Sequence, residues 1–208
     1  MKRPRRRKKL LTEKERDCMK CDIVLAGVGG QGGLSGSVVI AAAAMAEGLQ
    51  VKQSEVHGMS QRGGEVQAAL RISDQEIASP LIPYGSASII LSFEPLEALR
   101  YLHYLSPEGT LVSAVTPVVN FPSYPSLEEV LSKIRSFSNS LLIDADKIAK
   151  SIGAARAANM VMVGAASKFL PLTAENLEAA IKRIFASKGE RVVENNIEAF
   201  RLGQKAAN

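Results

Sequence analysis

Two glycine-rich turns in the first third of the chain constrain its fold more than any other feature. The first, Gly27-Val-Gly-Gly-Gln-Gly-Gly33, follows the apolar run Ile23–Ala26 and precedes a helix-like stretch over 34–47. A strand, a tight glycine turn and a helix N-terminus form a cradle for anions, because unpaired N–H groups point outward and the helix dipole favours negative charge. The residues predicted to bind a cofactor here are Gly27, Gly29, Gly30, Gln31 and Gly32.

The second turn, 54–64, reads Ser-Glu-Val-His-Gly-Met-Ser-Gln-Arg-Gly-Gly and combines flexible backbone with many functional groups. Arg62 offers a planar fork that suits a carboxylate or a phosphate. We take His57 and Arg62 as candidate catalytic residues, although a purely architectural loop remains open. The residues predicted to contact substrate or a partner are Ser54, Glu55, His57, Gly58, Ser60, Gln61, Arg62 and Gly63.

Apolar runs and helical patterns alternate along the chain, which predicts an α/β fold. We expect a three-layer, Rossmann-like doubly wound domain with a helical C-terminal third. Strands are expected at 21–26, 49–54, 65–72, 87–91, 110–115 and 141–143. Helices are expected at 34–47, 94–105, 127–137, 159–170, 175–185 and 189–207, with a closing turn at 106–109.

Several expected helix ends carry the residues that cap helices. Gly48 follows the alanine-rich first helix and supplies its C-terminal stop. Ser126, with Glu129 three residues later, has the spacing of a capping box, and Thr173 precedes another helical run.

The positive charge of the chain is concentrated at its start. Residues 1–18 contain nine of the 26 Lys and Arg residues but three of the 21 acidic ones, which leaves 19–208 close to neutral. Such a block predicts a disordered, basic N-terminal tail on a folded domain that spans 19–208. A nucleic-acid partner is not expected, because the domain shows no basic surface to match the tail.

Cysteine usage and hydropathy indicate a cytoplasmic protein. The two cysteines form a C-x-x-C motif, Cys18 to Cys21, and two thiolates cannot complete a tetrahedral zinc or iron–sulfur site. We therefore expect no metal on this chain and reduced thiols. No apolar run approaches the ~20 residues that a membrane span needs, so no membrane association is expected.

Taken by itself, the first turn is compatible with two classes of function. Gly27-x-Gly29-x-x-Gly32 satisfies the dinucleotide fingerprint, and Glu55 lies roughly where a ribose-binding acid belongs. An independent NAD-dependent dehydrogenase is therefore one alternative. A non-catalytic, Rossmann-like regulatory or binding module is the other.

Both turns together resemble the gamma-type subunit of 2-oxoacid:ferredoxin oxidoreductases. The similarity covers nearly all of 19–207, including Asn159-Met-Val-Met-Val-Gly164 and the run Glu194–Phe200. The sequence of the second turn, from Glu55 to Gly64, resembles that of the small subunit in the indolepyruvate branch of this family.

The resemblance implies a subunit that supports coenzyme A-dependent oxidative decarboxylation of an arylpyruvate, with electrons passed to ferredoxin. It also implies that thiamine diphosphate, Mg²⁺ and [4Fe-4S] clusters are carried by a large partner subunit. This chain would then be inactive alone, and its glycine turns would face substrate, coenzyme A or the partner.

Overall fold

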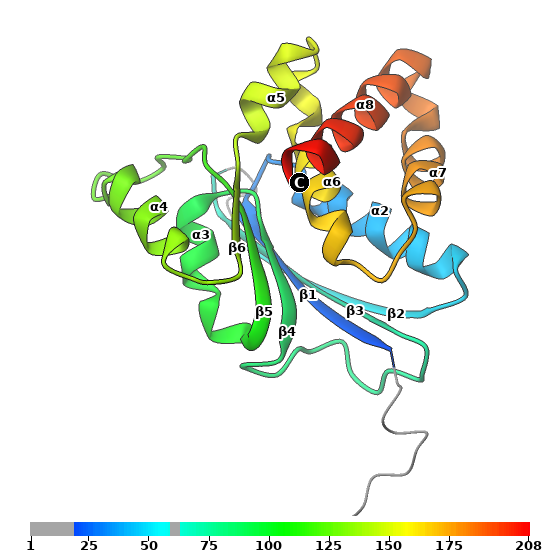
Figure 1. The fold of residues 1–208 in the computed structure, drawn as a ribbon, viewed down its shortest axis with the longest axis horizontal. Helices are drawn as coiled ribbons and strands as arrows, with labels where there is room; N and C mark the ends of the chain where they lie inside the picture. The colour runs from blue at the N-terminus through cyan, green and yellow to red at the C-terminus, as the bar shows by residue number, and fades with distance from the viewer. Residues whose placement is uncertain (1–18, 59–62) are drawn as a thin grey trace, which may run out of the picture.

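The computed structural model describes residues 19–58 and 63–208, with the backbone alone described at His57. The predictions for the N-terminal tail, for Cys18, and for Ser60, Gln61 and Arg62 fall outside the described residues. Within them the chain forms one mixed sheet with helices packed on both of its faces (Figure 1).

The sheet has six strands in the order β2-β3-β1-β4-β5-β6. Strands β1, β4, β5 and β6 run parallel, whereas β3 pairs antiparallel with both β1 and β2. The predicted α/β class is confirmed, with an antiparallel pair at one edge. The strands are β1 Lys20–Val28, β2 Gln50–His57, β3 Glu65–Ser73, β4 Ala87–Ser92, β5 Leu105–Ala114 and β6 Ser140–Ile143.

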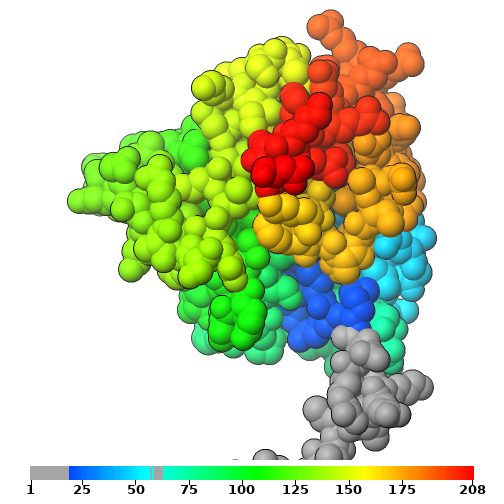
Figure 2. All heavy atoms as spheres, in the orientation of Figure 1, coloured from blue at the N-terminus to red at the C-terminus, as the bar shows by residue number. Residues whose placement is uncertain are grey.

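Two hydrophobic cores lie on opposite faces of the sheet. Side chains from α2, α5, α6, α7 and α8 build the larger core, and side chains from α3 and α4 build the smaller one. The C-terminal helices, yellow to red in Figure 2, form a continuous block on the surface. The helices are α2 Gly33–Ala46, α3 Pro95–Arg100, α4 Leu127–Arg135, α5 Ala145–Ser151, α6 Ala158–Ala166, α7 Ala174–Phe185 and α8 Glu190–Ala206.

Local sequence explains where these elements begin and end. The interior of β1 is continuously apolar apart from Asp22, because the strand is buried on both faces. The Ser126 and Thr173 side chains accept hydrogen bonds from the N–H groups of Glu129 and Asn176, as predicted for helix caps. Gly48 adopts a positive φ of 78° just beyond α2.

The predicted helix over 94–105 and its closing turn over 106–109 are wrong in their second half. Helix α3 ends at Arg100, a 3₁₀ turn covers 102–104, and β5 already begins at Leu105. The chain pairs with β4 at Leu105 and again from Thr110, with a register shift between the two. Pro107 and Gly109 therefore mark a bulge inside a strand. Proline and glycine occur in such bulges as well as in turns.

Two further boundaries differ from the prediction. Helix α5 follows β6 directly, because Asp144 caps it by accepting a hydrogen bond from Lys147 N–H. The apolar run over 159–170 is an α-helix only as far as Ala166 and continues as a 3₁₀ turn over 167–169. None of the helices in the described part of the chain is long and apolar enough to cross a bilayer.

Candidate functional site

The glycine turns lie at the point where the sheet changes winding direction. Strand β1 leads into α2 on one face, whereas its parallel neighbour β4 leads into α3 on the other face. The chains that leave these two strands diverge and open a crevice outside their carboxyl ends. In open α/β sheets this crevice is where ligands bind.

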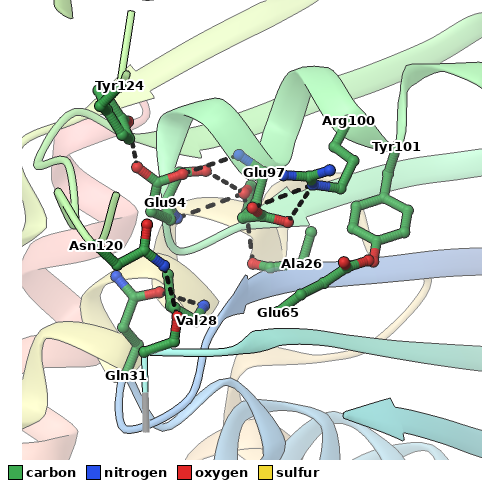
Figure 3. A network of polar contacts seen from close by, with 12 residues as sticks. Ala26, Val28, Gln31, Glu65, Glu94, Glu97, Arg100, Tyr101, Asn120 and Tyr124 are labelled. Atoms are coloured by element: carbon green, nitrogen blue, oxygen red, sulfur yellow. Dashed lines mark hydrogen bonds and ion pairs between the residues drawn. The ribbon is translucent and has the colours of Figure 1, made fainter. Parts of the chain in front are cut away.

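The Gln31 side chain ties the first turn together from inside. Its Oε1 accepts a hydrogen bond from Val28 N–H at 2.8 Å, and its Nε2 donates to the Phe93 carbonyl at 2.8 Å (Figure 3). Both ends of the amide are therefore engaged with backbone. In this arrangement Gln31 can offer a ligand its backbone, whereas its side chain holds β1 and β4 in register.

Glycine is required at Gly32 because α6 comes close. Its φ is 77°, and a Cβ there would lie 2.8 Å from Nδ2 of Asn159, whose amide donates to the Gly32 carbonyl at 3.0 Å. Gly30 also has a positive φ of 104°, but a Cβ there would meet nothing within 4 Å. The turn is thus packed at Gly32 and faces open space at Gly30.

The structure brings the two glycine turns into direct contact. Gly29 N–H donates to the Gly64 carbonyl at 2.8 Å, and Gly63 N–H donates to the Gly29 carbonyl at 3.3 Å. Gly58 N–H donates to the Glu65 carbonyl at 3.0 Å, which closes the base of the second turn. The described ends of the second turn therefore form one wall of the crevice.

A cavity of about 410 Å³ lies between the two glycine turns, which form its walls. Its lining is mostly glycine backbone and aliphatic side chain, together with the Phe93 ring. The N–H groups of the first turn of α2 border it and find no side-chain cap among the described residues, and a helix cannot satisfy its first N–H groups internally. The cavity can therefore hold a largely apolar group with an anionic end.

Two further hollows continue from this cavity along the carboxyl edge of the sheet. One of about 280 Å³ shares Gly30 and Phe93 with it and extends to Arg156 and Asn159. The next, of about 700 Å³, shares Arg156 and adds Lys188 from the region before α8. The crevice thus changes from apolar beside the glycine turns to charged, with Asp146 and Arg156 in the middle hollow and Arg156 and Lys188 in the last.

Ser54 and Glu55 lie inside β2, where the Glu55 carboxylate accepts a hydrogen bond from Gln53 Nε2. Strand β2 is at the far edge of the sheet and β3 separates it from β1. A ribose-binding acid ends the strand beside β1, so Glu55 is not in that position. This topology contradicts the geometry on which the nicotinamide interpretation depended.

Sequence reasoning missed four residues at the site: Phe93, Glu94, Asn120 and Asn159. Phe93 and Glu94 directly follow β4, and carboxyl ends of parallel strands are where functional groups gather. That position in the sequence could have singled them out. Asn120 and Asn159 come from distant segments. Local sequence gave no signal for Asn120, and Asn159 stood out only as the first residue of a run that carries the family resemblance.

Beside the crevice lies a cluster of acids and tyrosines (Figure 3). Glu94 is 1% exposed and accepts hydrogen bonds from Glu97 N–H, from Val118 N–H and from the Tyr124 hydroxyl. Burial raises the pKa of Glu97, although its ion pair with Arg100 at 3.0 Å opposes that effect. Burial, followed by the hydrogen bond to Glu94, also raises the pKa of the Tyr124 phenol.

This chain belongs to the pyruvate ferredoxin/flavodoxin oxidoreductase family, whose sequence profile matches residues 22–206. Within that class it is similar to subunit IorB of the indolepyruvate oxidoreductase from Archaeoglobus fulgidus, at 39% identity over 91% of this chain and 96% of that protein. The IorB protein of Pyrococcus horikoshii is also 39% identical, over 89% and 95%. The 2-oxoglutarate synthase subunit KorC of Methanothermobacter marburgensis is 30% identical, over 90% and 96%.

Solved structures of related enzymes share the fold. The gamma subunit of a keto/oxoacid ferredoxin oxidoreductase from Geobacter sulfurreducens matches with a TM-score of 0.68 at 25% identity, over 90% of this chain and 98% of that one. The 2-oxoglutarate:ferredoxin oxidoreductase from Magnetococcus marinus, with 2-oxoglutarate, coenzyme A and succinyl-CoA bound, matches with a TM-score of 0.73 at 24% identity. Here the chain covers 31% of a longer polypeptide, so the likeness concerns one part of that enzyme.

Proposed function

We propose that this chain is the small subunit of an indolepyruvate (arylpyruvate):ferredoxin oxidoreductase. The observation that carries the proposal is its 36–39% identity to four IorB subunits, across nearly their whole length. The reaction removes carbon dioxide from the 2-oxoacid and transfers the acyl group to the thiol of coenzyme A. Two electrons pass to ferredoxin, and one proton is released.

The redox cofactors of this reaction do not fit the residues of this chain. Its two cysteines are fewer than the four thiolates that a [4Fe-4S] cluster needs. Cys21 is buried in β1, and that burial raises the pKa of its thiol to about 12, which opposes thiolate formation. We therefore assign thiamine diphosphate, Mg²⁺ and the clusters to a large partner subunit, which also passes electrons to ferredoxin.

The part that we assign to this chain is one wall of the active region. The cavity between the glycine turns has the apolar lining and the N–H groups that an arylpyruvate or the pantetheine arm of coenzyme A could use. A loop of the large subunit is the third candidate for this wall. His57 and Arg62 remain the candidate catalytic residues of the second turn, and their side chains lie outside the described residues.

Co-expression with the large subunit of an indolepyruvate oxidoreductase tests this function. The purified complex should contain thiamine diphosphate and iron, and should reduce ferredoxin in the presence of both indolepyruvate and coenzyme A. The chain purified alone should be colourless and inactive under the same conditions. Oxidation of a 2-oxoacid by the isolated chain, or failure of the two chains to associate, would overturn the proposal.

A further inference from the structure

A long irregular segment connects β5 to α4 and crosses the carboxyl edge of the sheet. This crossing segment, residues 115–126, has no regular secondary structure, and connections of that kind are uncommon in compact domains unless they have a role. Two of its hydrogen bonds end on the Glu94 carboxylate, from Val118 N–H at 3.2 Å and from the Tyr124 hydroxyl. Glu94 therefore anchors the crossing segment to the end of β4.

The two oxygens of Glu94 serve separate purposes. Oε2 accepts the Glu97 N–H at 2.8 Å and caps α3, whereas Oε1 accepts both groups from the crossing segment. A helix cap requires only the first of these contacts. The second oxygen is therefore available to position something else, and Tyr124 can be changed without touching the cap.

The crossing segment in turn holds the second glycine turn. The Asn120 side chain donates from Nδ2 to the Gly63 carbonyl, and Gly63 N–H donates to the Gly29 carbonyl. A chain of hydrogen-bonded groups thus runs from the end of β4, through the crossing segment, to the point where the two glycine turns meet. Gly29 and Gly64 both line the cavity.

The first glycine turn is tied to the same place. Gln31 donates to the Phe93 carbonyl, and the Ser92 hydroxyl donates to the Glu94 carbonyl at 2.6 Å. Residues 92–94 are almost completely buried and so provide a rigid reference for both walls of the cavity. Because residues 92–94 are rigid, the distance between the two glycine turns depends on the hydrogen bonds that connect each turn to these residues.

We propose that Glu94 is a positioning residue for the active region, which acts through Tyr124 and Asn120 to hold Gly63 and Gly64 against Gly29. This inference rests on the proposed function, because it assigns a task to the wall that the function needs. Glu94 does not line the cavity and fixes its width from behind.

The test uses two variants. Tyr124→Phe removes the hydrogen bond from the crossing segment to Glu94, which we call the tether, and keeps the helix cap. Asn120→Ala removes the hydrogen bond from the crossing segment to Gly63. Tyr104→Phe is the matched tyrosine control, because that ring packs against Tyr84 and His103 away from the cavity. Glu47→Gln is a second control, which changes a hydrogen-bonded carboxylate away from the cavity. Glu47 accepts hydrogen bonds from Thr173 and Asn176 at the opposite end of α2.

Amide hydrogen exchange, followed by NMR on the full-length chain, gives the first measurement. In Tyr124→Phe the N–H groups of Gly29 and Gly63 should exchange on the order of 10-fold faster, the effect of losing one hydrogen bond to a charged acceptor. The Glu97 N–H should be unaffected, as should both glycines in the two controls. Unchanged exchange at Gly63 in Tyr124→Phe would reduce Glu94 to a helix cap and overturn the inference.

Steady-state kinetics of the complex with the large subunit give the second measurement. Tyr124→Phe and Asn120→Ala should each lower kcat/KM by about 10-fold, and the double variant should lose no more than the worse single variant, because both break one path. Faster exchange with unchanged kcat/KM would overturn the role in the reaction. If the wild-type complex turned over no 2-oxoacid, the proposed function would fail, and the exchange rates would still decide whether Glu94 positions the wall.

Discussion

The two glycine turns look alike in sequence but are held in different ways. The first is held by a side chain of its own, the Gln31 amide, and by Asn159 of α6, and neither of these side chains titrates. The second is held from outside, by backbone contacts to Gly29 and by the tether through Asn120 to a buried carboxylate. The comparison teaches that one glycine turn can be fixed largely by its own side chain, whereas another depends on contacts from distant segments of the chain.

The largest expected effect concerns the second turn and its function. Arg62→Ala should raise the activation free energy of the assembled enzyme by about 2–4 kcal/mol, because a desolvated bidentate contact to a carboxylate or phosphate would be lost. Its effect on the stability of the free chain should be about 1 kcal/mol or less. Steady-state kinetics of the complex and thermal melts of the free chain measure the two separately.

Arg62→Lys is the control for that experiment and should restore only part of the activity, since a point charge cannot reproduce the planar fork. Turnover near that of wild type in Arg62→Ala would mean that the second turn is architectural. The difference between the two turns would then disappear.

The first turn should show its largest effect in stability. Gly32→Ala should destabilise the fold by about 2 kcal/mol or more, because it combines a strained φ with a clash against Asn159. Gly30→Ala, which has strain but an open environment, should cost about 1 kcal/mol. Urea unfolding of both variants measures the difference.

Gly58→Ala completes this series from the second turn. The nearest atoms to an added Cβ there lie 3.8–3.9 Å away, so the change should stay within about 0.5 kcal/mol. A cost at Gly58 equal to that at Gly32 would show that both turns are packed equally tightly.

A smaller effect is expected on the pH dependence of the stability of the chain, and it comes from Glu97, close to Glu94. Burial raises the pKa of Glu97 above its ordinary value of 4.5, so the folded chain binds that proton more tightly than the unfolded chain does. The stability from this group is present below pH 4.5 and is lost as the pH rises through the folded pKa. Thermal melts should therefore show Glu97→Gln improving relative to wild type between pH 4 and pH 7.

Glu47→Gln should behave in the opposite way. Hydrogen bonds from Asn176 and Thr173 lower the pKa of Glu47, so its stabilising effect is present above pH 4.5 and is lost as the pH falls through the folded pKa. The same pH profile for both variants would remove the distinction between a carboxylate beside the tether and one at a helix cap.

The smallest expected effect is that of the basic N-terminal segment. A chain that begins at Met19 should keep the thermal midpoint and the partner binding of the full chain, because residues 1–18 offer few apolar side chains to bury. Loss of either on truncation would show that residues 1–18 contribute to stability or to partner binding.

Local signals in the sequence predicted most of the elements and both glycine turns. The α/β class followed from alternating apolar runs, and Ser126 and Thr173 marked helix starts because their hydroxyls cap nearby N–H groups. Sequence reasoning failed where a local pattern has two meanings. Pro107 and Gly109 fit either a turn or a strand bulge, and only pairing with β4 decides between them.

The site, too, could be predicted from the sequence only in part. The sequence by itself determined that the chain has a strand, a glycine turn and a helix, because a few residues and their order suffice to specify that unit. Only the tertiary structure decided that β2 lies beyond β3, that Gln31 faces inward, and that Asn120 and Glu94 support the second turn. Contacts between residues far apart in the chain depend on how the whole sheet is ordered, and no local pattern carries that information.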